Sequence, residues 1–386
     1  MRRVGIIGIG ATKARPATPT VSYKELTYEA AKLAYQNAQI RAQDVQSFVT
    51  LAEDFNEGTS IFDEYTPDQL GGARKPNHTL THDGLVGIAD AYMQIASGLF
   101  DIVVVEAHSK ASNIGNLHDI QAYALDPNWV RPLGIPAEAI GALEATAYWQ
   151  NLDASAKEAA DAQWTVVYKN KGNARKNPHA AWPAVLKRQQ YDRSVQRCSP
   201  LKEIETAPMA DGACVVVLAA EDKIKVNGAK PVWLQGVGWS SETSEVGSRQ
   251  WAKASYATDA AARAYKMAGI TRPADEIGLF EIDDTFAFKE LQHLESIGVF
   301  EKGTAWKHTL EGRTCADGKT PVNVSGGCLG FGDLLEAKGL FQVYELVKQL
   351  KGQAGARQVS GVRKACALSW RGVPTTSGAC VILGTD

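Results

Sequence analysis

Cysteine is the residue type in this chain most suited to chemistry, either as a nucleophile or as a metal ligand. The chain holds six cysteines, none spaced as C-x-x-C, and none stands between residues 1 and 197. This spacing supports neither a zinc site nor a disulfide framework, so we expect no bound metal. The six positions are Cys198, Cys214, Cys315, Cys328, Cys366 and Cys380.

The glycine-rich start is a second candidate functional feature, because a glycine-rich turn after a strand often binds a dinucleotide. Gly8 and Gly10 follow an apolar segment, but the third glycine of a G-x-G-x-x-G pattern would fall on Lys13. No acidic residue follows at the end of the next strand at the usual distance. We therefore interpret the two glycines as a tight exit from a strand.

Composition restricts the class of protein. The chain has 386 residues and a formal net charge of −2, which gives no reason to expect nucleic acid as a partner. No apolar run reaches the roughly 18 residues of a membrane span. The apolar stretch at the start ends at Gly10, which is short for a secretory signal peptide. We expect a cytoplasmic protein that binds neither nucleic acid nor a membrane.

A repeated segment indicates how the elements that position a site are organised. Residues 29–40 return as residues 259–270, offset by 230 positions, and six of the twelve residues are identical. Solenoids repeat every 20 to 50 residues or so, and this much larger offset indicates a duplicated domain instead. The length also suits two domains. We place them at residues 1–225 and 226–386, with an irregular excursion at about 109–200.

Apolar, β-branched runs alternate with helical periodicity in both halves. This alternation predicts an α/β protein with parallel sheets covered by helices on both faces. Residues 52–78 lack a period and are predicted to be loop. The predicted strands are residues 3–10, 45–51, 101–107, 214–220, 231–238, 277–282, 364–370 and 378–383, and the predicted helices are residues 23–39, 84–98, 257–269, 286–297 and 335–350.

A series of short motifs runs along nearly the whole chain. They are VGIIGIGAT at the start, IASG and DIVVVEA at 95–107, KN at 169–170, NPH at 177–179, CSPL at 198–201, ADGAC at 210–214, EIDDTF at 281–286 and PVNVSGG at 321–327. In this order they resemble the thiolase superfamily, specifically its sterol-carrier-protein-like and archaeal acetoacetyl-CoA thiolase branch. The resemblance implies two pseudo-symmetric βαβ-duplicated halves in a five-layer αβαβα arrangement.

The catalytic positions of that family are replaced in this chain. The resemblance places Thr81 where the family has its nucleophilic cysteine, with His82 beside it as a candidate base. Asp283 and Asp333 stand where the family has its two catalytic histidines, and Asp284 takes the place of a structural anchor. A threonine hydroxyl is barely ionised without a strong adjacent base, so acyl transfer through Thr81 is disfavoured.

Aldol or retro-aldol chemistry on an acyl-CoA needs no covalent intermediate. It needs a base and a site that stabilises a thioester enolate, and Asp283 and Asp333 are the candidates for acid and base. Two close carboxylates do not both ionise readily, so one of them keeps a proton or a cation offsets the pair. Thiolase-like aldolases of steroid side-chain degradation replace the same positions, though by tyrosines. We therefore predict a lipid-degrading lyase that makes or breaks a carbon–carbon bond without a cysteine.

The substrate implied by the resemblance is a coenzyme A thioester, with no permanently bound cofactor. The glycines near the expected acyl pocket would allow close approach of the pantetheine arm. The predicted CoA-binding residues are Ser325, Gly326, Gly327, Cys328 and Gly332.

Two other functions remain open. Cys328 could be the displaced nucleophile of an acyltransferase, although buried cysteines are usually inert. The chain could also be a silent subunit that binds acyl-CoA or supports an active thiolase-like partner. The resemblance further implies a homodimer and a separate zinc-ribbon/OB-fold protein of the DUF35 type.

Overall fold

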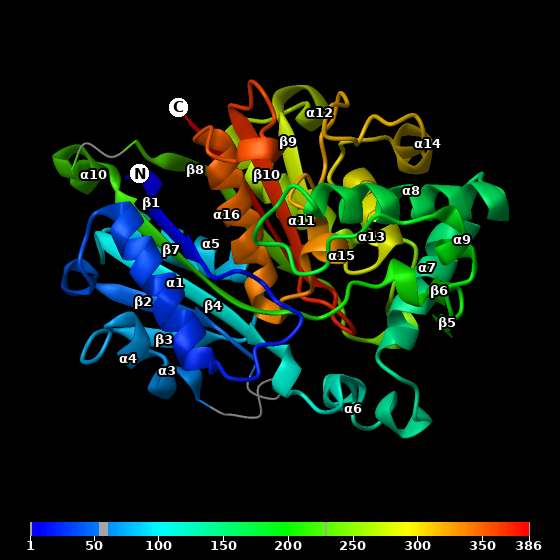
Figure 1. Ribbon diagram of the computed structural model, residues 1–386, viewed down its shortest axis with the longest axis horizontal. Helices are drawn as coiled ribbons and strands as arrows, with labels where there is room; N and C mark the ends of the chain where they lie inside the picture. Colours follow the sequence, from blue (N-terminus) through cyan, green and yellow to red (C-terminus); the bar gives the residue numbers. More distant parts are fainter. Residues whose placement is uncertain (1, 54–60, 228–229, 386) are drawn as a thin grey trace.

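The computed structural model describes residues 2–53, 61–227 and 230–385. Within these ranges nine strands form one sheet in the order β3-β2-β4-β7-β1-β8-β11-β10-β9 (Figure 1). No helix in the same ranges is long and apolar enough to cross a membrane. The strands are β1 (Val4–Ala11), β2 (Ser47–Leu51), β3 (Asn77–Leu80), β4 (Ile102–Lys110), β7 (Asp211–Ala220), β8 (Val232–Ser241), β9 (Leu279–Ile282), β10 (Lys364–Trp370) and β11 (Ser377–Gly384).

The sheet consists of two halves with the same strand order. The order β2-β4-β7-β1 in the first half corresponds to β9-β10-β11-β8 in the second. β1 and β8 join the halves as an antiparallel pair in which Gly5 lies opposite Trp233. Because the halves run in opposite directions, an approximate two-fold axis relates them. The predicted fold class is confirmed, while the boundary at 225/226 stays a prediction.

Helices lie in three layers around the two half-sheets. α1 (Tyr23–Ala38) packs on β1 and β7 of the first half, and α11 (Ser255–Ala268) packs on β8 and β11 of the second. α5 (Gly84–Ala96) and α16 (Lys338–Leu350) contact each other and strands of both halves, so they form the central layer. The result is the predicted αβαβα arrangement.

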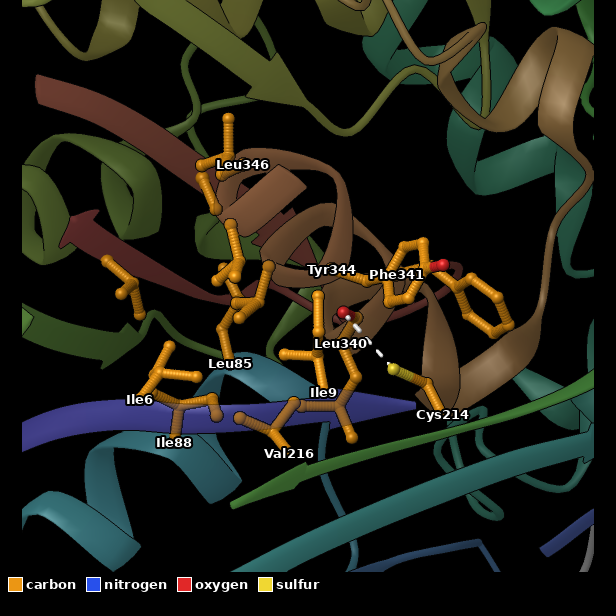
Figure 2. Packing of buried hydrophobic residues seen from close by; sticks show 14 of the residues in the cluster. Ile6, Ile9, Leu85, Ile88, Cys214, Val216, Leu340, Phe341, Tyr344 and Leu346 are labelled. Atoms are coloured by element: carbon orange, nitrogen blue, oxygen red, sulfur yellow. Dashed lines mark hydrogen bonds between the residues drawn. The ribbon is translucent and has the colours of Figure 1, made fainter. Parts of the chain in front are cut away.

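The central layer is held by apolar packing. Figure 2 shows Leu85 and Ile88 of α5 and Leu340 of α16 beside Ile6 and other side chains of the sheet. Nearly every residue of α16 is buried, which is typical of a helix enclosed on all sides. Cys214 also belongs to this core, where its sulfur lies 3.5 Å from the Leu340 carbonyl oxygen.

The repeated segments bring their helices unusually close to the sheet. A Cβ added to Gly10 of β1 would stand 2.2 Å from the carbonyl oxygen of Ala30 in α1. A Cβ added to Gly238 of β8 would stand 2.2 Å from the carbonyl oxygen of Ala260 in α11. Such contacts cannot form without movement, so glycine in the strand permits the close approach. The alanines shared by the two segments are therefore packing residues.

The tyrosine shared by the two segments also has one role in both. The Tyr35 hydroxyl donates to the Leu70 carbonyl at 2.6 Å, and the Tyr265 hydroxyl donates to the Ile297 carbonyl at 3.0 Å. Each tyrosine thus ties its helix to the C-terminal end of another helix of its own half. The two copies occupy equivalent positions, as a duplication requires.

The expectation of parallel sheets is wrong for one strand in each half. β7 and β11 run antiparallel to both of their neighbours. The pairs β2–β3, β2–β4 and β9–β10 are parallel, as helical crossovers require. β11 follows β10 directly through residues 371–376 and runs antiparallel to it. β7 follows β4 after the excursion and likewise runs antiparallel to it, so neither strand is reached by a crossover between parallel strands.

The excursion holds more regular structure than its sequence predicted. It contains α7 (Glu138–Gln150) and α8 (Ala156–Ala174), and α8 packs on α13, α14 and α15 of the second half. Ser155 and Glu158 form a capping box that marks the start of α8. Residues 52–78 likewise hold two short helices and the start of β3.

The remaining helices are α3 (Phe62–Tyr65), α4 (Pro67–Leu70), α6 (Leu117–Ala122), α9 (Arg188–Asp192), α10 (Glu221–Asn227), α12 (Pro273–Glu276), α13 (Ala287–Ser296), α14 (Ala305–Leu310) and α15 (Gly327–Phe331), and β5 (Gln196–Cys198) pairs with β6 (Leu201–Lys202).

Replacing Gly10 or Gly238 by alanine should destabilise the protein by about 1–3 kcal/mol, because the added methyl meets backbone atoms. Gly172 of α8 is the matched control, since a Cβ there meets no atom within 4 Å. Gly172→Ala should be neutral or stabilise by up to about 1 kcal/mol. Denaturant titration measures the difference. Equal stability of Gly10→Ala and Gly172→Ala would contradict the packing role.

Candidate active site

The two central helices begin at the same point. Asp83 is the cap residue of α5, where its Oδ1 accepts from the Leu85 N–H at 2.9 Å. Its Oδ2 accepts from the Gly339 N–H at the start of α16, at 3.2 Å. A Cβ on Gly339 would stand 2.2 Å from the Asp83 carboxylate, so this position requires glycine. One carboxyl therefore bridges two helix N-termini.

A buried lysine is the first residue of α16. Lys338 is 4% exposed, and its Nζ lies 2.8 Å from Oδ2 of Asp283 and 3.2 Å from Oγ1 of Thr285. A cation at a helix N-terminus opposes the helix dipole. The carboxylates of the site compensate for this cost. The expectation that a cation would offset Asp283 and Asp333 is met by a lysine of the chain itself.

The carboxyls of the site differ in their tendency to ionise. Burial alone would raise the pKa of Asp283, but the ammonium of Lys338 holds it below its usual range. Burial raises the pKa of Asp333, and it raises the pKa of Asp83 to about 6. For both carboxyls the effect of burial is larger than the opposing effect of the Lys338 ammonium. Burial would lower the pKa of Lys338, but the surrounding carboxylates raise it. The site thus holds one firm ion pair and two carboxyls that retain protons more readily.

Asp333 is fixed by its backbone. Its N–H donates to the Pro208 carbonyl at 2.8 Å, and its carbonyl accepts from the Ala210 N–H at 2.9 Å. Its Oδ1 accepts from the Leu335 N–H at 3.1 Å. These bonds hold the carboxyl at the wall of a cavity, which is a suitable position for an acid or base.

A cavity of about 880 Å³ adjoins this group. Asp333, Lys338 and Thr285 line it, whereas Asp283 does not and lies behind Lys338. The volume suits a ligand of the size of a substrate. The other walls come from residues 117–140 and 197–209 of the excursion and its end, residues 241–249, and residues 371–377 between β10 and β11.

Thr81 and His82 lie outside the lining of this cavity. Thr81 is exposed, and His82 is half-buried with its Nδ1 accepting from the Asp83 N–H at 2.9 Å. Burial lowers the pKa of His82 to about 4, so its imidazole is neutral at neutral pH. The structure brings Asp283 and Asp333 together around Lys338, but it does not bring Thr81 to them.

Four of the five predicted CoA-binding residues line a much smaller space, of about 20 Å³, beside Lys338, and Gly326 does not line it. Gly326, Gly327 and Gly332 have φ values of 119°, 57° and 121°, which favour glycine on backbone grounds. Ser325 donates from its hydroxyl and its N–H to Glu281. Direct contact between these residues and CoA stays a prediction.

Asp284 is an anchor for the start of α15, which follows Ser325. Its Oδ1 accepts from the Cys328 N–H, and its Oδ2 accepts from Nδ2 of Asn170 at 2.7 Å. Burial, and then the carboxylate of Glu290, raise the pKa of Asp284 to about 7. The predicted anchoring role agrees with these bonds.

Sequence reasoning missed Lys338. The residue lies in a segment whose periodicity predicts a helix, and that segment also carries Gln342, Glu345, Lys348 and Gln349. A lysine beside these polar residues gives no signal in the sequence that it is buried. Its burial is evident only in the structure, where its ammonium must find carboxylates inside the protein.

Comparison with known proteins agrees with this architecture. The family model for a thiolase C-terminal domain-like region matches residues 217–385. The acetyl-CoA acetyltransferase of Methanothermobacter thermautotrophicus is 30% identical over 369 residues, which cover 94% of this chain and 94% of that protein. Sterol carrier protein 2 of Bos taurus is 26% identical over 94% of this chain and 69% of its own length.

Solved structures share the fold across the whole chain. The Ltp2–ChsH2(DUF35) aldolase superposes with a TM-score of 0.83 at 22% identity, covering 99% of this chain and 97% of that one. The acetyl-CoA acetyltransferase of Syntrophomonas wolfei gives a TM-score of 0.75 at 16% identity, covering 100% of both chains. At these identities the likeness shows the fold alone.

Replacing Lys338 by methionine should lower the free energy of unfolding at pH 7 by about 3–5 kcal/mol, because Asp283 is left buried and unpaired. Without the ammonium, the pKa of Asp283 in the folded protein rises above its unfolded value. Stability should therefore be lost as the pH rises and recovered as it falls. Denaturant titration of the variant at about pH 5 and pH 8 checks this.

The double variant Lys338→Met with Asp283→Asn is the control, since it removes both charges. It should be more stable at pH 7 than Lys338→Met alone, and with the Asp283→Asn single variant it gives the coupling between the two residues. A Lys338→Met chain with the stability of the wild type at both pH values would contradict the ion pair's role.

Proposed function

The chain belongs to the thiolase superfamily, in its sterol-carrier-protein-2-like branch, and from this premise we propose that it performs aldol-type chemistry on an acyl-CoA thioester. The family includes thiolase-like acyl-CoA acetyltransferases. The observation that carries the proposal is the ion pair of Lys338 with Asp283, beside Asp333 at the wall of the large cavity. An aldolase of the same fold, Ltp2–ChsH2(DUF35), supports it.

The cysteines of the chain favour a mechanism without a covalent intermediate. Residues 1–197 contain none. Cys328 is 5% exposed, and burial followed by the carboxylates of Asp283 and Asp284 raises the pKa of its thiol well above the usual range. The thiolate needed for attack is therefore disfavoured at this position. Thr81, in turn, does not line the cavity.

In the proposed reaction a β-hydroxyacyl-CoA is cleaved. The carboxylate of Asp333 takes the proton of the β-hydroxyl, whose oxygen becomes the carbonyl oxygen of the leaving aldehyde or ketone. The Cα–Cβ bond breaks, and its electron pair forms a thioester enolate. The ammonium of Lys338 stabilises the enolate oxygen. Asp333 then returns its proton to Cα, which gives the shortened acyl-CoA.

Asp283 serves this reaction through Lys338. The carboxylate of Asp283 keeps the ammonium charged and directs it, so Asp283 is a positioning residue. The raised pKa of Asp333 suits a group that both takes and returns a proton. The reverse reaction, formation of the bond, uses the same groups in the opposite order.

We propose further that the working assembly includes a separate DUF35-type protein and a second copy of this chain. The name of the Ltp2–ChsH2(DUF35) aldolase supports the first of these partners. β3 is an edge strand of the sheet with half-buried residues, and such an edge can pair with another copy. The site of action proposed from the sequence is the cytoplasm.

Asp333→Asn should lower the turnover of a β-hydroxyacyl-CoA by about 10²- to 10⁴-fold while acyl-CoA binding persists, because only the ionisable group is lost. Asp283→Asn should also lower it, and the two changes together should cost less than the product of the single losses. Release of the carbonyl product, measured with a zinc-ribbon protein present, reports turnover.

In the wild type, kcat/KM should fall with decreasing pH through a pKa above the usual aspartate range, because Asp333 must be ionised to act.

Thr81→Ala is the matched control and should change turnover by less than about tenfold, since no acyl-threonine forms. Wild-type rates from both Asn variants would reduce the two aspartates to structural residues. If the wild type turned over no β-hydroxyacyl-CoA even with the zinc-ribbon protein present, the silent-subunit hypothesis would replace this proposal.

Alkylation with iodoacetamide should leave the lyase activity largely intact, because no cysteine takes part in the proposed reaction. Mass spectrometry identifies the labelled residues, and activity is measured on the same samples. Loss of activity that follows labelling of Cys328, with protection by acyl-CoA, would instead identify Cys328 as a displaced nucleophile.

A further inference from the structure

A second buried cation lies on the same cavity as Asp333 and Lys338. Arg249 stands between β8 and α11, its side chain is 6% exposed, and it lines the cavity. Its guanidinium packs over the Trp251 ring, 5.4 Å from the ring centroid. The reaction proposed above gives this arginine no role.

Part of the Arg249 guanidinium makes no hydrogen bond within the described part of the chain. Nη2 donates to the Pro374 carbonyl, which fixes the group. Within the part of the chain that the structure describes, Nε and Nη1 make no hydrogen bond, although Nη1 lies 3.7 Å from Oε1 of Glu144. Buried donors without hydrogen bonds cost free energy that a suitable ligand would recover.

The carboxyls around Arg249 do not satisfy its remaining N–H donors. Glu144 is also in contact with the ammonium of Lys289, so one carboxylate serves two cations. Lys289 otherwise contacts the Tyr256 hydroxyl and the Gln292 amide oxygen, at 3.1 and 3.0 Å, and neither carries charge. Glu242, the other carboxyl that acts on Arg249, has a pKa raised by burial. Neither Glu144 nor Glu242 accepts a hydrogen bond from Nε or Nη1 of Arg249, so these donors remain available to a carboxylate from outside the protein.

Two of the three other arginines on the cavity are already paired with carboxylates, whereas Arg131 donates to the Tyr123 and Leu125 carbonyls and, among the described residues, has no hydrogen bond from Nε. Arg371 forms an ion pair with Glu53, and Arg197 forms one with Glu203 at 3.1 Å. Both pairs leave little net charge for a ligand. Arg249 differs from them in having close neighbours that do not satisfy its Nε and Nη1 donors.

A buried network connects Arg249 to the proposed reaction site. From Glu144 and Lys289 it passes through the Tyr256 hydroxyl to Nε2 of His293, 2.9 Å away. Nδ1 of the same histidine lies 2.9 Å from the carbonyl oxygen of Asp283. Arg249 therefore has a fixed position relative to the group that would act on the thioester.

We propose that Arg249 binds a carboxylate on the acyl part of the substrate, so that the preferred substrates are acyl-CoA thioesters with a second, free carboxyl group. The inference rests on the proposed function and names its substrate class. A monoanion fits better than a phosphate of the CoA, because Glu144 and Glu242 would repel a group of higher charge. A carboxylate also matches the planar donors of a guanidinium.

The test compares acyl-CoA pairs of equal carbon number by isothermal titration calorimetry with the full chain. Glutaryl-CoA is compared with valeryl-CoA, adipoyl-CoA with hexanoyl-CoA, and free CoA is the reference. In at least one pair the carboxylated member should bind about 10- to 100-fold more tightly, as expected for hydrogen bonds to a charged group. Arg249→Gln should remove this preference, and Arg249→Lys should retain part of it because the charge remains.

Arg197→Ala is the matched control, since it removes a cavity arginine that is already paired, and it should leave the preference unchanged. Thermal unfolding of each variant shows that it is folded. Equal binding of both members in both pairs by the wild type would overturn this inference and leave the proposed function standing. If Arg249→Gln lowered the affinity for free CoA as much as the affinity for the carboxylated acyl-CoAs, the group bound by Arg249 would be a CoA phosphate. That result would also overturn this inference. Failure of every compound to bind, also with the zinc-ribbon protein present, would overturn the proposed function and this inference with it.

Discussion

The ion pair between Lys338 and Asp283 is the interaction on which the candidate site depends. It holds the start of α16 against the end of β9, where α5 also begins. Helix N-termini attract negative charge, and the carboxyls of Asp83, Asp283 and Asp333 gather there. A group of buried carboxylates without a cation would be strongly unfavourable. With Lys338 among them, one carboxyl is ionised and the others keep protons more readily, which is a useful state for proton transfer.

The duplicated framework fixes this group in place. The central helices α5 and α16 are enclosed between the half-sheets, while α1 and α11 pack closely on the outside over glycines of β1 and β8. None of the residues that hold Lys338 depends on a long loop. A site built on the ends of rigid elements keeps its geometry better than one built on loops. The cavity beside it, in contrast, has walls from loops, where variation between relatives can change the substrate.

Sequence alone predicted the fold well and the site in part. The repeat at 29–40 and 259–270 predicted the duplicated halves, because its alanines and tyrosine make the same contacts twice. The motifs indicated Asp283 and Asp333 as candidates, which stay predictions as catalytic residues, and the structure places both near Lys338. Periodicity could not reveal the reversed strands β7 and β11, since strand direction is set by long-range pairing. It also could not distinguish Lys338 from a lysine on a solvated helix face, because burial of that helix end depends on β9 and α5, far away in the sequence.

Thr81, the position predicted for a nucleophile, stands two residues before the cap of α5, and the carboxyl of Asp83 links that cap to the start of α16 beside Lys338. A helix N-terminus lowers the pKa of a cysteine placed there and so favours its thiolate. In this chain the carboxyl of Asp83 already accepts from one N–H in the first turn of α5 and one in the first turn of α16. A thiolate near this cap would lie close to the Asp83 carboxyl, and these backbone N–H groups would not be available to stabilise it. Negative charge formed during a reaction is better held by the ammonium of Lys338, which faces the cavity. An enolate formed in that cavity gains from this arrangement, and an attacking cysteine would not.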